Sequence, residues 1–113
     1  MDSPHTVALS FCVINTYKGK QKVFEESIRY VKSKGKRSEI FLEENQKIIA
    51  LHLLKYFDKR LNAKTFARCH RQYIVNLNKI TCISGKGVFL DKVEVVPLGR
   101  NFRGSIFEKY FHE

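Results

Sequence analysis

Short apolar runs separated by glycine or by clusters of polar residues are the main pattern along the chain. Runs rich in Val, Ile, Phe and Thr that are bounded in this way are typical of β-strands joined by tight turns. They fall at residues 6–17, 23–24, 28–31, 40–42, 47–50, 66–70, 80–83, 88–90 and 93–98. Gly19, Gly85 and Gly87 lie in the turns between runs, and residues 73–77 fit either a short helical turn or a strand. The pattern predicts a series of short strands connected by hairpins.

Two segments have helical rather than alternating spacing. Leu51, Leu54, Phe57 and Leu61 recur at steps of three, three and four, which predicts an amphipathic helix over residues 53–61. This segment has no good N-cap residue at its start. Apolar residues of the tail indicate a short closing helix, and they are Phe102, Ile106, Phe107, Tyr110 and Phe111.

Length and composition favour a globular protein. The chain has 113 residues, of which 43% are hydrophobic and 12% aromatic, so we expect one domain over residues 1–113 with a single core. The apolar run 7–14 is too short to span a bilayer, and no positively charged leader precedes it. Cys12, Cys69 and Cys82 form no C-x-x-C pair, so neither a disulfide framework nor a zinc site is suggested. We therefore expect a cytoplasmic protein without a membrane segment.

The charge balance points to an anionic partner. The formal net charge is +10 and the sequence pI is about 9.7, values typical of nucleic-acid binders, although a membrane surface or acidic proteins attract the same charge. Residues 59–90 contain no Asp or Glu at all.

Three clusters of basic and polar residues lie next to the predicted strand ends. Arg forks match the O6 and N7 edge of guanine, and Gln can pair with adenine, so such clusters suit the reading of duplex DNA. The clusters comprise Lys34, Lys36, Arg37 and Ser38; then Arg68, His70, Arg71 and Gln72; and finally Arg100, Asn101 and Arg103. We expect these residues to form projections that contact DNA.

A catalytic interpretation would begin with the adjacent thiol and imidazole of Cys69 and His70. Neighbouring residues on a strand face opposite ways, so we expect Cys69 to point inward while Arg68 and His70 point outward. The sequence also has no phosphate-binding glycine loop and no motif for a metal or another cofactor. We therefore expect a protein that is not an enzyme and needs no cofactor. A redox switch at Cys69 is a further hypothesis, because His70 and Arg71 could lower its pKa; an inert structural cysteine is the alternative.

The segment F-A-R-C-H-R-Q-Y-I-V-N-L-N-K-I, residues 66–80, resembles the signature of the LytTR DNA-binding domain family. The resemblance extends over residues 8–111. It implies a mostly β fold, with about ten short strands in stacked antiparallel sheets and one or two short helices. It also implies that loops, rather than an inserted helix, read successive major grooves, and that the chain is an effector domain of a bacterial response regulator acting on transcription.

By this resemblance the three loops map onto the three clusters. The first loop corresponds to residues 36–38, the second to 70–72 and the third to 100–101. The chain departs from the family pattern at Lys32, where an acid is common, and at Gln72, where a small residue is usual. Asn76 is interpreted as a turn-forming residue rather than a DNA contact.

The predicted function is sequence-specific binding of double-stranded DNA. The alternative is a non-catalytic module that binds RNA or a regulatory protein through the same basic face. If the chain resembles the family in its partners as well, it pairs on DNA at repeated elements, and a receiver or sensor domain lies upstream. The target sequence, the sign of regulation and the input signal do not follow from the sequence.

Overall fold

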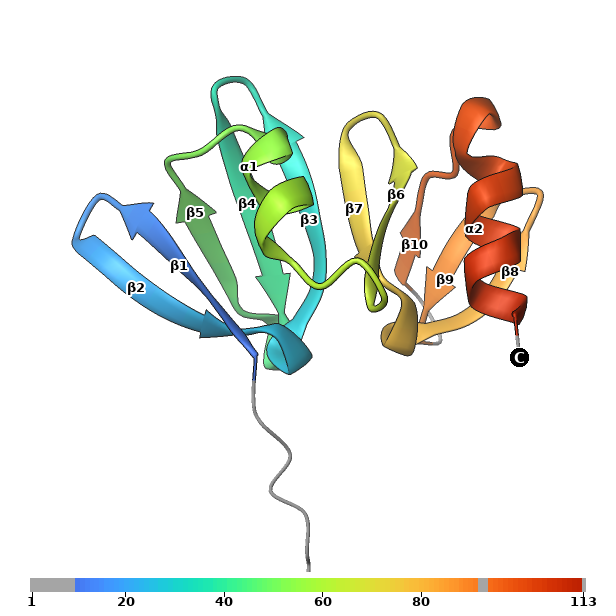
Figure 1. Ribbon diagram of the computed structural model, residues 1–113, viewed down its shortest axis with the longest axis horizontal. Coiled ribbons are helices and arrows are strands. Elements are labelled where there is room, and N and C mark those ends of the chain that lie inside the picture. The colour runs from blue at the N-terminus through green and yellow to red at the C-terminus, as the bar shows by residue number, and fades with distance from the viewer. Residues whose placement is uncertain (1–9, 92–93, 113) are drawn as a thin grey trace, which may run out of the picture.

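Within the part of the chain that the structure describes, ten antiparallel strands form three sheets (Figure 1). The computed structural model describes residues 10–91 and 94–112. The three sheets have the strand orders β1-β2, β5-β4-β3-β7-β6 and β10-β9-β8. The strands are β1 (Phe11–Thr16), β2 (Gly19–Phe24), β3 (Ile28–Lys34), β4 (Arg37–Leu42), β5 (Lys47–Ala50), β6 (Phe66–His70), β7 (Tyr73–Asn76), β8 (Ile80–Ser84), β9 (Gly87–Leu90) and β10 (Glu94–Val96). The expectation of a mostly β fold with about ten short strands is confirmed.

Two α-helices accompany the sheets, as expected. The first, α1 (Leu54–Arg60), begins after Leu53, which makes no side-chain capping bond. Its buried residues Leu54 and Phe57 belong to the stripe that predicted it. The second, α2 (Arg103–Phe111), closes the chain beside the three-stranded sheet (Figure 1). Short 3₁₀ turns occur at η1 (Glu25–Ser27), η2 (Glu43–Asn45), η3 (Leu77–Lys79) and η4 (Arg100–Phe102).

The segment that fitted either a helical turn or a strand is strand β7, followed by η3. Residues Tyr30, Val31 and Lys32 of β3 pair with Val75, Ile74 and Tyr73 of β7. A strand forms here because β3 offers a free edge whose backbone groups need partners. Asn76 ends β7 as a structural residue, as interpreted: it is 1% exposed, its amide donates to the Ile28 carbonyl at 2.8 Å, and its Oδ1 accepts from the Asn78 N–H at 2.9 Å.

The five-stranded sheet is packed on both faces. Successive strand residues face opposite ways, so Ile74 and Val75 belong to different apolar clusters. One cluster lies with α1 and the β1-β2 hairpin and includes Ile14 and Phe57. The other lies with the three-stranded sheet and α2 and includes Ile106. The single core expected from the length is therefore divided in two by the central sheet.

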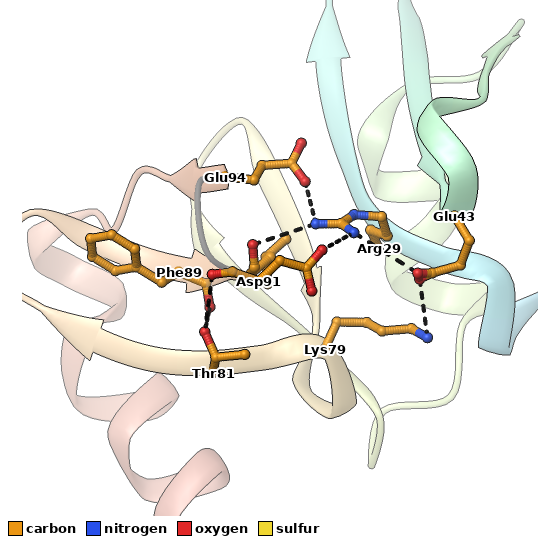
Figure 2. Close-up of polar contacts among 8 residues, drawn as sticks. Arg29, Glu43, Lys79, Thr81, Phe89, Asp91 and Glu94 are labelled. Carbon is orange, nitrogen blue, oxygen red and sulfur yellow. Dashed lines mark hydrogen bonds and ion pairs between the residues drawn. The ribbon is translucent and has the colours of Figure 1, made fainter.

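Arg29 of β3 joins the five-stranded sheet to the three-stranded one (Figure 2). Its guanidinium donates to the carboxylates of Asp91 and Glu94, and it lies 3.9 Å from Glu43. Lys79 reaches the same Glu43 carboxylate at 3.3 Å. The Arg29 side chain is 13% exposed, so these pairs are partly shielded from water. They fix how the two sheets sit against each other.

Several predicted boundaries moved. The first strand was expected at 6–17; within the described residues it spans Phe11–Thr16, and positions 6–9 lie outside them. The tip of the last hairpin, at positions 92–93, also lies outside the described residues. Gly87 begins β9 with φ +137, and a Cβ there would lie 2.6 Å from the Val96 carbonyl oxygen. Only glycine therefore allows β10 to approach β9 so closely.

Candidate nucleic-acid interface

The three predicted basic projections lie on one edge of the molecule. They are the β3-β4 turn at residues 35–36, the β6-β7 turn at 71–72, and η4. Figure 1 shows all three at its upper edge. The Ser33 N–H donates to the Gln72 carbonyl at 2.8 Å, and the Gly99 N–H donates to the Cys69 carbonyl at 2.7 Å. These backbone bonds tie the second projection to both of the others.

The β3-β4 turn presents three exposed cations. Gly35 has φ +61, which a two-residue hairpin loop with glycine in its first central position requires. Lys34, Lys36 and Arg37 are exposed around this turn, and the Lys34 ammonium lies 3.5 Å from the Glu39 carboxylate. The turn therefore carries its charge on a rigid hairpin.

Ser38 does not belong to this exposed group. Its residue is fully buried, and its hydroxyl donates to the His52 carbonyl at 2.8 Å. Ser38 was expected to contact DNA, but strand alternation turns its side chain inward, away from exposed Arg37. Its role is to attach β4 to the segment that leads into α1.

The β6-β7 turn presents Arg71 and Gln72, which are both exposed. His70 is half-buried, and its Nδ1 accepts from the Gln72 N–H at 3.1 Å. A neutral imidazole that accepts through Nδ1 carries its proton on Nε2, which leaves that N–H as a donor. The ring meets Tyr73 edge-on, with centroids 5.5 Å apart. His70 therefore both holds the turn and offers one donor.

Arg68 was expected to contact DNA, and its guanidinium makes three hydrogen bonds within the protein, to the Asp58 carboxylate and the Arg71 carbonyl. Nε donates to Asp58 Oδ1 at 3.1 Å, Nη2 donates to Asp58 Oδ2 at 2.9 Å, and Nη1 donates to the Arg71 carbonyl at 2.7 Å. Such a two-point fork on a carboxylate fixes the guanidinium plane. Arg68 thus supports the turn from which Arg71 projects.

The third projection combines η4 with the first turn of α2. Arg100, Asn101 and Arg103 are all exposed. A cation in the first turn of a helix opposes the helix dipole, so Arg103 does not serve helix stability. Gly99 lies against the second projection: a Cβ at this position would be 3.5 Å from the His70 Cα. The second and third projections therefore pack directly together.

Cys69 is fully buried between these projections, as strand alternation predicted. Burial raises the pKa of its thiol to about 12 and outweighs the lowering effects of a backbone hydrogen bond and of Arg68. The prediction that His70 and Arg71 lower this pKa is wrong, because the thiol faces the apolar core and the two side chains do not. The structure favours the inert structural alternative.

Sequence reasoning overlooked one aromatic residue near the edge. Tyr17, in the β1-β2 turn, is 70% exposed, and the Arg37 guanidinium lies 5.9 Å from its ring centroid. The sequence signal for this site is the basic, polar turn around Gly19, where Lys18, Lys20 and Lys22 follow Tyr17. The cluster thus extends beyond the three expected projections.

The described residues present Arg, Lys, Gln and Asn side chains on adjacent turns of a β scaffold, and these are groups that suit contacts with nucleic acid. The sequence pattern of the LytTr DNA-binding domain family matches residues 21–110. The chain belongs to this family, which is a family of DNA-binding domains and not of enzymes. DNA is therefore its partner.

A solved structure supports the same assignment. It is the LytTr DNA-binding domain of a Bacillus cereus protein described as a methyl-accepting/DNA response regulator. The TM-score is 0.73 and the sequence identity 28%, and the match covers 92% of this chain and 98% of the other. No curated protein matches the chain. No helix among the described residues is long and apolar enough to cross a membrane.

Proposed function

We propose that this domain recognises a particular duplex sequence through its three projections and acts in bacterial transcription regulation, in the cytoplasm, as an effector domain. One observation carries the proposal: Arg71, Gln72, Arg100 and Asn101 are exposed on two turns that backbone bonds and close packing hold together. Fork-shaped cations and amides are the groups that distinguish base edges in the major groove. Rigid turns place them without a large loss of side-chain and backbone entropy on binding.

We expect the projections to make two different kinds of contact with DNA. Lys34, Lys36 and Arg37 suit phosphate contacts, which supply affinity and register but little sequence information. Arg71 and Arg100 suit base contacts in the groove. The molecule measures 46 Å along its longest axis, and one turn of B-DNA is about 34 Å long. The three projections follow one another along this axis (Figure 1), so we expect them to contact neighbouring grooves of one duplex.

The test begins with a random-library selection of bound duplexes, followed by anisotropy titration of the selected duplex and a scrambled one. Arg71→Ala and Arg100→Ala are each expected to weaken specific binding by about 1–3 kcal/mol while changing scrambled-duplex binding less. Lys64→Ala is the control, because Lys64 lies before β6 and lines a surface depression with Lys109 at the far end of α2. Equal, weak affinity for every duplex would refute specific recognition.

Two further arms test partners. Competition by single-stranded RNA as strong as by the selected duplex would favour the alternative RNA-binding module. We also expect two copies to occupy duplexes with repeated elements, and a receiver or sensor domain to control the domain from upstream. Sedimentation with duplexes that carry one or two copies of the selected element measures how many protein copies bind each duplex. If only one copy bound to both duplexes, the expected pairing on DNA would be refuted.

A further inference from the structure

The β1-β2 turn has no role in the proposal above, although its surface is unusual. Tyr17 and Lys18 form the two-residue turn, and Lys20 follows on β2. The Thr16 hydroxyl donates to the Gly19 carbonyl at 2.9 Å and accepts the Lys18 N–H at 3.2 Å, which holds the turn in one shape. Tyr17 is 70% exposed, so burial of its ring contributes little to the stability of the fold. We call Tyr17, Lys18 and Lys20 the flank patch.

The flank patch continues the surface of the β3-β4 turn. Arg37 stands 5.9 Å from the centre of the Tyr17 ring, within the range of a cation–π contact. Between the two turns is an open hollow of about 440 Å³, lined by Tyr17, Lys34, Lys36, Arg37, Glu39 and Ile49. The aromatic ring therefore forms one wall of a hollow whose other wall carries cations already assigned to phosphate.

The charge in this region is not neutralised within the described part of the chain. Among those residues, no carboxylate lies within 4 Å of an ammonium or guanidinium of Lys18, Lys20, Lys36 or Arg37. The Glu39 carboxylate is 5% exposed and is shared by two other lysines. An exposed phenol among unpaired cations suits a sugar-phosphate backbone, because Tyr and Lys both donate to phosphate oxygens.

The position of the hairpin determines which part of the DNA it can reach. The β1-β2 sheet lies at the opposite end of the long axis from α2, on the outer side of β3 and β4 (Figure 1). We propose that the flank patch binds backbone phosphates of the DNA just outside the segment read by the three projections, on one side of that segment only. This inference rests on the proposed function, since it takes the projections to set the path of the DNA.

The test compares duplexes of different length around the selected sequence. The probes are the trimmed selected duplex and two forms extended by about ten base pairs, one on each side. Extension on one side is expected to tighten binding and to steepen the dependence of log K on log salt by about 1.8, at about 0.9 per neutralised phosphate. Extension on the other side is expected to change neither quantity.

Lys18→Ala with Lys20→Ala should abolish the gain from extension and leave binding of the trimmed duplex unchanged. Tyr17→Ala should reduce the gain in affinity about threefold, the effect expected for the loss of one neutral hydrogen bond. The matched control is Lys64→Ala with Lys109→Ala, which removes the same charge from neighbouring exposed lysines near the end of α2 and should preserve the gain.

The outcomes separate the two proposals. Specific binding of the trimmed duplex without a gain from either extension would overturn the flank patch alone. An equal gain from both sides, or an equal loss in the control variant, would also overturn it by showing a general charge effect. No preference for the selected duplex over a scrambled one would refute the proposed function, and the flank patch with it.

Discussion

At the scale of single residues, Arg68 shows how a basic side chain next to an exposed turn can be held by partners within the protein. Its fork on Asp58 and its bond to the Arg71 carbonyl connect α1, β6 and the β6-β7 turn. The pair is partly exposed, with side-chain exposures of 26% and 41%, so its contribution to stability is modest. Its main effect is to orient Arg71.

Asp58→Asn separates this positioning effect from simple charge. Removal of an acid makes the domain more basic, which by itself strengthens binding to any duplex. Without the carboxylate fork, the support beneath Arg71 loosens, so we expect stronger binding to a scrambled duplex and weaker binding to the selected one. Anisotropy titration with both duplexes measures the ratio. A parallel strengthening for both would show that Arg68 does not position the turn.

Cys69 gives a prediction for alkaline pH. Its pKa is raised by burial from 9.0 to about 12, so folding favours the neutral thiol. The folded state has its full stability below about pH 9. As the pH rises from 9 toward 12, the Cys69 thiol ionises in the unfolded chain but stays neutral in the folded protein, so the free energy of unfolding falls. Between pH 9 and 10.5 the free energy of unfolding should fall by about 1–2 kcal/mol more in the wild type than in Cys69→Ala.

Denaturant unfolding at the two pH values measures this difference. Cys82→Ala is the control, because it removes an exposed thiol instead of a buried one. If Cys69→Ala shows the same pH dependence as the wild type, burial does not hold the thiol neutral. Iodoacetamide should likewise modify Cys82 well before the buried Cys12 and Cys69.

At the scale of elements, the β1-β2 hairpin is attached to the rest of the fold by apolar side chains of the first cluster and by a few polar contacts. The Asn15 N–H donates to His52 Nε2 at 2.9 Å, and the Leu51 N–H donates to the Asn15 carbonyl at 2.8 Å. The Tyr56 hydroxyl donates to the Val13 carbonyl at 2.6 Å. The His52 ring stacks on Tyr56 with centroids 3.7 Å apart. His52 is therefore the titratable part of the attachment.

Acid should loosen this hairpin. Burial and the nearby Arg60 lower the pKa of His52 below 6.5, so the folded protein favours the neutral ring that accepts from Asn15. The stabilisation is present above pH 6.5 and is lost as pH falls through the lower folded value. Hydrogen-exchange protection of the Asn15 and Leu51 amides should drop between pH 7 and pH 5. His52→Gln keeps an acceptor without titrating, so an equal drop in that variant would contradict the mechanism.

At the scale of the whole molecule, three sheets and two apolar clusters must act as one support for the basic edge. The second cluster reaches from the five-stranded sheet to α2, and the Arg29 pairs lie at the same junction (Figure 2). The first and second projections rise from the central sheet, whereas the third begins after β10. Their alignment therefore depends on the contact between the sheets.

Arg29→Ala tests that contact. Loss of the guanidinium leaves Asp91 and Glu94 without their cation, and we expect a decrease of about 1–2 kcal/mol in the free energy of unfolding after allowance for the partial exposure of both acids. Urea denaturation measures it. Lys86→Ala, at an exposed turn, should change stability by less than about 0.5 kcal/mol. Equal effects of the two substitutions would show that the Arg29 pairs contribute nothing specific.

Much of this architecture was predictable from local patterns. The period of two in the strands, the stripe of Leu and Phe in α1, and the glycines of the hairpins act over a few neighbouring residues, so the sequence displays them directly. The basic clusters around Lys36, Arg71 and Arg100 were also visible, because like charges are close together in the chain. Their assignment to duplex DNA came from the family signature at 66–80.

The roles of individual side chains were less predictable, since they depend on partners distant in the sequence. Arg68 finds Asp58 only when α1 lies beside β6, and Ser38 finds the His52 carbonyl only when β4 pairs with β5. Tyr17 escaped notice because its neighbour Arg37 is 20 positions away in the chain and close only in the fold.

The sequence by itself determined that this protein is a basic chain of short strands with a LytTR signature, because period, charge and motif are local properties. Only the tertiary structure decided which basic side chains are exposed and which are held by partners within the protein. Pairing of β3 with β7 and packing of Gly99 on His70 bring the three projections to one edge. Folding also pairs the Arg68 guanidinium with Asp58, buries Ser38 and Cys69, and places Tyr17 beside Arg37. These contacts join segments that are far apart in the sequence, so they exist only in the folded chain.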